Sequence, residues 1–239
     1  MRLSMKLLRL KLFQETACYL KPLAYKVGET YPLAPFSTVK GMLHAVLGAT
    51  EYIPMNLSIQ GQSESFMIDY QKKFMYKKAE VPQLVTTDGL PEAPIPDSKV
   101  YTTMPMYQHL LYNVEHVIHV EAEETILNEL YNRLHQLSTT LSMGRWEDIV
   151  RIDEVCYVEG TEDWMEELVY NQYVPVNLEN VMYFDGPKAY YRLPRKYEIR
   201  DGRREWDYVT AAYVQKSTLL DDNIEIMTDG EYSIFLLKG

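Results

Sequence analysis

The chain has 239 residues, of which 46% are hydrophobic and 24% are charged, so it can bury the core of one large domain. Its formal net charge of −10 argues against a protein that binds nucleic acid over its whole surface. The charge is uneven, with a net +5 in residues 1–50 and −12 in residues 121–186, so the N-terminal part can face phosphate. Two distant cysteines outside any metal-ligand spacing favour a reducing cytoplasm over a disulfide-stabilised secreted fold.

A half-buried strand is predicted near the N-terminus. Leucines at positions 8, 10 and 12 alternate with Arg9 and Lys11, which is the period of a strand with one buried face. The same basic residues interrupt the apolar segment, so we expect neither a signal peptide nor a membrane span there.

A helix is predicted from Ser37, as N-cap, to Gly48, as a left-handed C-cap. Apolar residues between them form one stripe at helical spacing. The hydroxyls of Ser37 and Thr38, with Lys40 and the helix N-terminus, suit a phosphate, although an ordinary capped core helix carries the same features. Gly41 in the middle of this helix indicates either close packing on a strand or the close approach of a ligand.

The middle of the chain reads as a strand pair with an irregular loop. Residues 65–70 predict a strand, the proline-rich residues 81–99 predict the loop, and residues 101–109 predict a return strand. Basic and aromatic side chains alternate between the first strand and the loop. That mixture is typical of a nucleic-acid surface, and equally of a solvated hairpin whose lysines protect an exposed edge.

The second half adds a strand at 114–120, a helix at 125–141 and a strand at 149–158. The resulting order of strand, helix, strand, strand, helix, strand predicts an α+β, ferredoxin-like fold of the RNA-recognition type. Residues 159–239 predict extra strands. Within them, residues 188–204 carry seven Lys or Arg against two acids, so a solvated strand pair and an RNA contact are both consistent with this segment.

Three stretches carry a family resemblance. Residues 28–43, which contain Gly-Glu-Thr-Tyr-Pro and Ser-Thr-Val-Lys-Gly-Met-Leu, resemble the N-terminal motif of the CRISPR-associated Cas-five family of the RAMP superfamily. Residues 141–148 resemble the family's Leu-Gly-Arg-Ser-Glu-like turn, with Met143 in place of Leu and Trp146 in place of a small residue. Residues 191–209 resemble its late Leu-Pro segment. The best-fitting variant is the type I-B subunit of the Cascade surveillance complex.

The resemblance implies one RAMP-type domain over residues 1–239, with a βαββαβ palm, a β-hairpin thumb inserted at 71–110 and a C-terminal β-rich extension at 159–239. It also implies a non-catalytic subunit that caps the five-prime handle of the CRISPR guide RNA. The expected partners are that RNA, a Cas-seven-type backbone subunit and a large Cas-eight-type subunit, with target DNA reached only through the complex. No cofactor, metal or membrane is implied.

The expected RNA contacts combine this resemblance with residue chemistry. Single-stranded RNA is held by amides, hydroxyls and basic side chains on phosphates, and by rings on bases. For the palm the expected contacts are Lys21, Tyr25, Lys26, Ser37, Thr38, Lys40, Gly144 and Arg145. For the thumb they are Lys72, Lys73, Lys77 and Lys78, and for the basic C-terminal segment they are Arg192 and Arg195.

Two other functions remain open at this point. Relatives of type I-C are themselves nucleases that process repeat RNA. A metal-independent endoribonuclease of this kind could use His44 as general acid or base, although an exposed helix histidine is the simpler interpretation. A structural assembly protein could dock a basic partner on its acidic residues 121–186. His116 and His119 make a poor metal pair, because strand alternation puts them on opposite faces.

Overall fold

The computed structural model describes residues 4–24, 26–76, 101–176, 184, 186–220 and 225–238. Helix α1 covers Phe36–Leu47 and helix α2 covers Glu124–His135. The strands are β1 (Met5–Ala17), β2 (Val27–Gly28), β3 (Asn56–Tyr76), β4 (Tyr101–Glu121), β5 (Leu141–Ser142), β6 (Ile149–Asp163), β7 (Asn171–Pro175), β8 (Ala189–Arg200), β9 (Arg203–Val214) and β10 (Ile226–Thr228).

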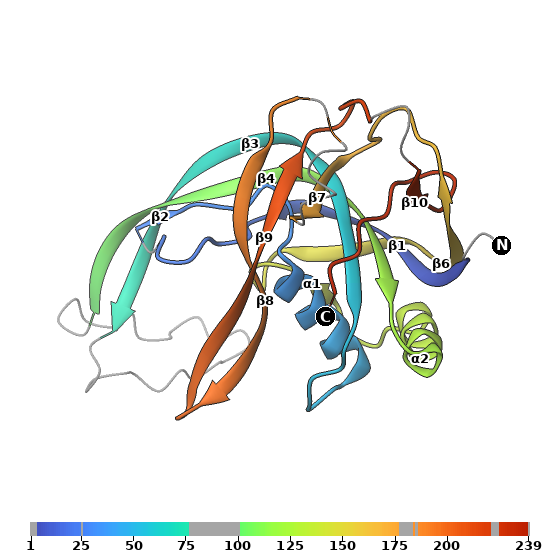
Figure 1. Cartoon of the computed structure of the whole chain (residues 1–239). Helices are drawn as coiled ribbons and strands as arrows, with labels where there is room; N and C mark the ends of the chain where they lie inside the picture. The colour runs from blue at the N-terminus through green and yellow to red at the C-terminus, as the bar shows by residue number, and fades with distance from the viewer. Residues whose placement is uncertain are drawn as a thin grey trace.

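The architecture is mixed α/β and is dominated by one large antiparallel sheet with strand order β10-β6-β1-β4-β3-β7-β9-β8 (Figure 1). Helix α1 lies between β1 and β3 along the chain, and α2 lies between β4 and β6. Both helices cover the same side of the sheet, where alternating leucines of β1 pack against them in the main core. None of the helices in the described ranges is long and apolar enough to cross a membrane.

The helix boundaries differ from those expected. Ser37 is not the N-cap, because α1 already begins at Phe36, which is fully buried, and Pro35 caps it without a side-chain hydrogen bond. Gly48 is confirmed as the left-handed C-cap, with a φ of 63°. Helix α2 ends at His135 rather than at Leu141, which instead pairs with Val150 in the sheet. Sheet pairing therefore overrides the helical spacing of the leucines.

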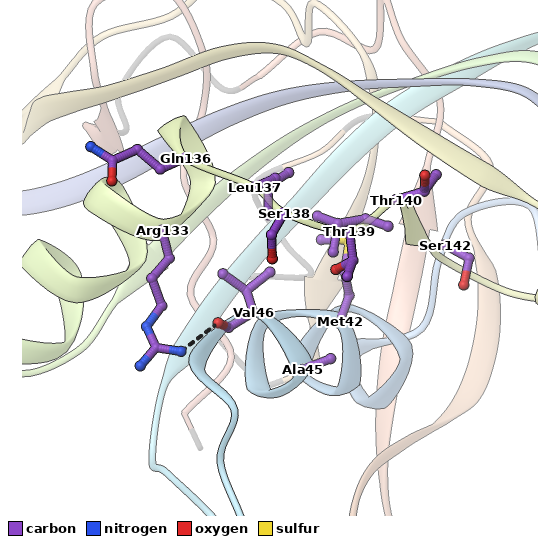
Figure 2. Close-up of a pocket in the computed structure, with 11 residues that line it drawn as sticks. Met42, Ala45, Val46, Arg133, Gln136, Leu137, Ser138, Thr139, Thr140 and Ser142 are labelled. Carbon is purple, nitrogen blue, oxygen red and sulfur yellow. Dashed lines mark hydrogen bonds between the residues drawn. The ribbon is translucent and has the colours of Figure 1, made fainter.

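The C-terminal ends of the two helices meet at a hollow of about 480 Å³ (Figure 2). Arg133 of α2 donates from Nη1 to the carbonyl oxygen of Val46 in α1 at 3.2 Å, which satisfies one of the free carbonyls at that helix end. The hollow is lined by Met42, Ala45 and the chain from Gln136 to Ser142. It contains none of the residues that the sequence marks as RNA contacts.

Strands β3 and β4 form a hairpin much longer than predicted. The strand expected at 65–70 spans Asn56–Tyr76, and its register with β4 continues from Asn56 opposite Glu121 to Tyr76 opposite Tyr101. The outer half of this hairpin reaches away from the helices (Figure 1). It exposes large apolar side chains, namely Phe66, Met67, Ile68, Tyr70, Phe74, Met75 and Tyr107. The arm therefore leaves a large apolar surface outside the core.

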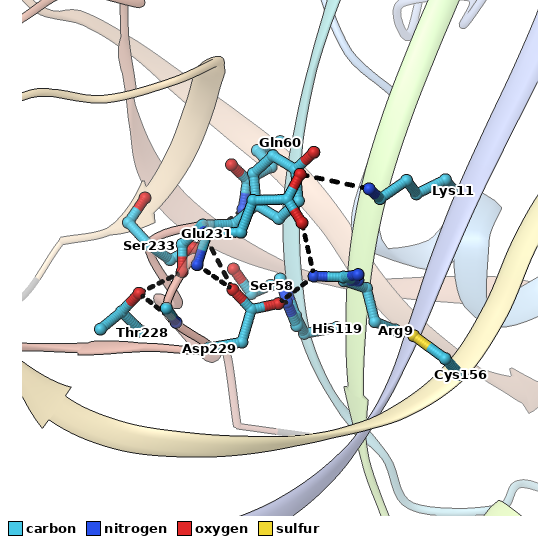
Figure 3. Close-up of polar contacts among 12 residues, drawn as sticks. Arg9, Lys11, Ser58, Gln60, His119, Cys156, Thr228, Asp229, Glu231 and Ser233 are labelled. Atoms are coloured by element: carbon cyan, nitrogen blue, oxygen red, sulfur yellow. Dashed lines mark hydrogen bonds and ion pairs between the residues drawn. The ribbon is translucent and has the colours of Figure 1, made fainter.

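The C-terminal segment is fixed to the sheet face opposite the helices by a buried ionic cluster (Figure 3). The Asp229 side chain is fully buried, and its carboxylate lies 2.9 Å from both Arg9 Nη1 and His119 Nε2. Burial raises the pKa of Asp229, but hydrogen bonds from His119 and from the amides of Tyr232 and Glu231 lower it well below its usual range. The carboxylate therefore stays charged and holds the last residues against β1 and β4.

Candidate nucleic-acid interface

A hollow of about 540 Å³ opens at the N-terminal end of α1, and we call it the helix-start pocket. It joins three parts of the chain that are distant in sequence. The loop after β1 contributes Lys21, the first turn of α1 contributes Ser37 and Thr38, and the turn before β6 contributes Gly144 and Arg145. The structure thus brings together five of the residues that the sequence predicts for the palm. Pro194, Trp206 and Tyr208 of the β8–β9 hairpin form the remaining wall.

A second hollow, of about 490 Å³, lies on the other side of Ser37, and we call it the lysine pocket. Its basic residues are Lys40 from α1 and Arg195 and Lys196 from β8. Ser37 lines both pockets, so they are adjacent along the start of α1. Lys196 was not among the predicted contacts. Its position in the basic segment 188–204 was the sequence feature that could have identified it. Only the packing of β8 on α1, however, brings Lys196 close to Lys40.

The other predicted contacts lie elsewhere. Lys26 is exposed just before β2, and Lys72 and Lys73 are exposed on the outer half of β3, away from both pockets. Tyr25, Lys77 and Lys78 fall outside the described residues. The predicted set is therefore divided between the pockets and the β3–β4 arm.

The turn that carries Gly144 and Arg145 is held by Asp148. One carboxylate oxygen of the fully buried Asp148 accepts from the amides of Cys18 and Arg145, at 2.9 Å each. The Arg145 guanidinium binds both oxygens of the same carboxylate and also pairs with Glu147 at 2.9 Å. Arg145 is consequently engaged with carboxylates and stabilises the pocket wall. It is therefore less available to bind phosphate than the sequence analysis expected.

Gly144 is required at its position. Its φ is 110°, a conformation that side chains rarely adopt, and an added Cβ would lie 2.9 Å from both the Asp148 carboxylate and the Cys18 carbonyl. Glycine at position 144 therefore allows the loop at Cys18 to approach this turn closely.

Lys21 and Arg192 are the cations most available to a ligand near the helix-start pocket. Lys21 Nζ is 2.5 Å from Glu29 Oε1, and half of the Glu29 side chain is exposed, so this ion pair is weak enough to exchange. The Arg192 guanidinium stacks 4.3 Å from the ring centre of Tyr208. No carboxylate of the described chain lies within ion-pair distance of Arg192. Both cations stand next to tyrosine rings.

Trp206 and Tyr208 of the β8–β9 hairpin were not considered in the sequence prediction. Trp206 contacts Tyr197 with ring centres 5.2 Å apart, and the Arg204 guanidinium lies 4.7 Å from the Tyr197 ring. Trp206 and Tyr208 alternate along β9, so they share the face that closes the helix-start pocket. Exposed rings flanked by arginines are suited to stacking unpaired bases.

Lys40 is buried, with 3% of its surface exposed, although it lies outside the apolar stripe predicted for this helix. The β8–β9 hairpin covers that face of α1 and encloses the side chain. Burial, followed by the nearby charges of Arg195 and Lys196, lowers the pKa of Lys40 to about 8, while Asp207 opposes the shift. The folded protein therefore disfavours the charge on this amine.

We expect Lys40→Met to stabilise the isolated protein at pH 7 by up to about 3 kcal/mol, because it removes a buried charge. The folded pKa is below the ordinary value of 10.5, so the penalty is complete below pH 8 and is relieved as pH rises toward 10.5. The stability difference between variant and wild type, measured by urea unfolding, should shrink between pH 8 and pH 10. A difference that is zero at pH 7, or constant with pH, would contradict this electrostatic account.

His44 also lines the lysine pocket, but both of its ring nitrogens are occupied by backbone groups. Nδ1 lies 2.7 Å from the Lys40 carbonyl oxygen and must donate to it, while Nε2 accepts from the amide of Ile53 at 2.9 Å. The expected exposed histidine is therefore half-buried, and it fixes α1 to the loop before β3. A ring held in this way has no free nitrogen for proton transfer.

The two neighbouring histidines of β4 are bound to separate partners. His116 Nε2 is 2.8 Å from the Tyr19 hydroxyl, and His119 Nε2 is 2.9 Å from Asp229 on the other face of the sheet. Burial lowers the pKa of His116 to about 4, so it stays neutral. Within the described ranges, no group of three or more His, Cys, Asp or Glu is arranged to hold a metal.

Solved structures share this architecture at low sequence identity. A chain from a "CRISPR RNA-guided surveillance complex" aligns with a TM-score of 0.52 and 12% identity, over 89% of this chain and 90% of that chain. A CRISPR protein from Archaeoglobus fulgidus aligns with a TM-score of 0.51 and 10% identity, over 98% of this chain and 100% of that chain. The fold is thus one that CRISPR-associated proteins use. No curated protein matches the sequence.

Residues 7–211 match the family model described as CRISPR-associated protein (Cas_Cas5). That match spans most of the chain, so the protein belongs to the Cas-five family. The resemblance first seen in residues 28–43, 141–148 and 191–209 is confirmed.

Proposed function

We propose that this protein is an RNA-binding subunit of a type I CRISPR effector complex of the Cascade kind, most similar to type I-B, and that it caps the five-prime handle of the guide RNA. The observation that carries the proposal is the convergence of cations, hydroxyls and rings at the start of α1 in a chain whose net charge is −10. Basic groups gathered at one place in an acidic protein favour a local polyanionic ligand. Exposed rings beside them favour a single strand over a duplex.

The palm assignment follows from the strand order. We infer that β6, β1, β4 and β3, in that order and all antiparallel, with α1 and α2 as connections, form a ferredoxin-like palm. In that arrangement the outer half of the β3–β4 hairpin is the thumb, and β7 to β10 are the extension. The handle lies across the helix-start pocket, between the palm and the β8–β9 hairpin.

The proposed partners are a backbone subunit of the Cas-seven type and a large subunit of the Cas-eight type. One of the aligned structures belongs to a CRISPR RNA-guided surveillance complex, and this supports a role in a multisubunit complex. The thumb supports it independently, because its apolar exposed side chains are surrounded by water in the isolated chain. The proposed location is the cytoplasm, where guide RNA is made.

A non-catalytic role is proposed because His44 is committed to two backbone groups. We expect the purified protein to leave a single-stranded repeat RNA intact in EDTA, as seen by denaturing gel. Cleavage by the wild-type protein that disappears in His44→Ala would instead establish the endoribonuclease.

RNA binding is tested by titrating single-stranded repeat RNA onto the wild-type protein and onto Lys21→Ala with Arg192→Ala. Arg192 pairs with no carboxylate of the described chain, and the Lys21–Glu29 pair is exposed enough to exchange. The double variant should therefore bind roughly tenfold more weakly at about 0.1 M salt. The slope of log K against log salt should become shallower by roughly 1 to 1.5. Lys216→Ala with Arg151→Ala removes the same charge away from both pockets and should bind normally. Equal weakening in the two double variants would refute the assigned site.

A further inference from the structure

The lysine pocket contains a buried charge whose need for a counter-ion is unmet within the described chain. The Lys40 ammonium makes a single hydrogen bond there, to the Tyr52 hydroxyl at 3.1 Å, and no carboxylate lies within ion-pair distance. An ammonium can donate three hydrogen bonds, so two donors remain. A buried and unpaired charge is costly, so buried charges are usually paired, and an anionic ligand would supply the partner that Lys40 lacks.

The surrounding groups add to the positive charge around Lys40. Lys196 Nζ and Lys40 Nζ lie 5.4 Å and 5.6 Å from the centre of the same Tyr52 ring, so both ammonium groups gather around that tyrosine. Arg195 also lines the pocket, and it pairs with Asp207 on β9 through its Nε at 2.9 Å. Glu51 is on the rim and is exposed. Neither carboxylate reaches the Lys40 ammonium, so the interior of the pocket is left to an anion.

Gly41 lines the lysine pocket without filling it. A Cβ added at Gly41 would meet nothing within 4 Å, so the glycine is not explained by close packing of helix on strand. Glycine in a helix interior costs roughly 1 kcal/mol relative to alanine. Gly41 lines the lysine pocket one turn after Ser37, and its bare backbone keeps the space open. The first turn of α1 contains no acidic residue that would repel an anion.

We propose that the lysine pocket binds one phosphate group of the RNA backbone, held by Lys40 and Lys196 and by the hydroxyls of Tyr52 and Ser37. This proposal rests on the proposed function and specifies where the strand goes. From the helix-start pocket the strand passes Ser37, which lines both hollows, and places one linkage over Gly41. The bound phosphate supplies the counter-ion that Lys40 lacks in the isolated chain.

The test uses single-stranded repeat RNA made with one neutral methylphosphonate linkage at a time. In wild-type protein, one linkage should lower affinity about tenfold more than its neighbours. Lys40→Met should bind the unmodified RNA about tenfold more weakly and should lose the sensitivity to that linkage alone. Gly41→Leu keeps every cation but fills the pocket, and it should behave in the same way. Lys216→Met, the matched surface control, should retain the full pattern. Uniform sensitivity along the strand, or a pattern unchanged in Lys40→Met, would overturn the proposal.

A second arm uses sodium sulfate with protein carrying ¹³C-labelled lysine. The chemical shift of the Lys40 ε-carbon reports the pKa of its amine, and sulfate bound in the pocket should raise that pKa. The charged and titratable groups that surround the amine are the same with and without sulfate, namely Arg195, Lys196, Asp207, Glu51, His44 and Tyr52. If wild-type protein fails to bind RNA, the proposed function fails. The sulfate arm still decides the pocket, because a rise in that pKa supports an anion site and the absence of any change refutes it.

Discussion

Asp148→Ala is expected to destabilise the protein by about 3–5 kcal/mol, which is the range for removing one partner of a buried ion pair. The change leaves the guanidinium of Arg145 without its bidentate acceptor and leaves the amides of Cys18 and Arg145 unpaired. The turn at 144–148 then loses its attachment to the loop after β1. Urea unfolding measures the loss, and RNA affinity should fall with it, because this turn forms one wall of the helix-start pocket.

The matched control is Asp153→Ala. Asp153 also pairs with an arginine, Arg151, but the pair is exposed, with 42% and 64% of the two side chains accessible. Its removal should change stability by less than about 0.5 kcal/mol. Similar losses at the two positions would show that Asp148 does not organise the pocket.

Shortening the thumb is expected to abolish assembly of the complex while sparing the palm. Replacing residues 74–103 with Asn-Gly joins Lys73 directly to its cross-strand partner Met104 through a tight hairpin turn. The removed strand ends have exposed side chains, such as Phe74 and Met75, so the melting temperature of the isolated subunit should change by only a few degrees. Size-exclusion of the reconstituted complex should show the subunit unassembled.

A smaller deletion serves as the control for the thumb. Replacing residues 77–100 with Asn-Gly joins the paired Tyr76 and Tyr101 and keeps every strand residue of the hairpin. If the paired strands carry the contact, this variant should assemble better than the larger deletion. Normal assembly by the larger deletion would refute the thumb assignment, and a collapse of its melting temperature would show that residues 74–103 belong to the core.

The parts of the fold that depend on local periodicity could be predicted from the sequence. The alternation of leucines with basic residues predicted β1, the apolar stripe at helical spacing predicted α1, and Gly48 predicted the end of that helix. The end of α2 was misplaced because Leu141 continues the helical spacing but pairs in β5, which depends on distant Val150. Single-sequence periodicity contains no information about such a competing partner.

The candidate site was also predicted only in part. Lys21, Ser37, Thr38, Gly144 and Arg145 were predicted from the family resemblance combined with residue chemistry, and the structure brings them to one pocket. The burial of Lys40 and the rings of Trp206 and Tyr208 were missed, since both follow from the packing of the β8–β9 hairpin against α1. That contact joins α1, which ends at Leu47, to a hairpin that begins at Ala189, and no local sequence pattern spans such a distance.

The most direct test of the central claim is to sequence the RNA that the purified subunit retains when it is expressed with its CRISPR locus. A protein that caps the guide should retain one short species whose reads share a single repeat-derived five-prime end. Lys21→Ala with Arg192→Ala should retain much less of it, while Lys216→Ala with Arg151→Ala should retain the same amount as wild type. Absence of RNA, or fragments with scattered ends, would contradict the account.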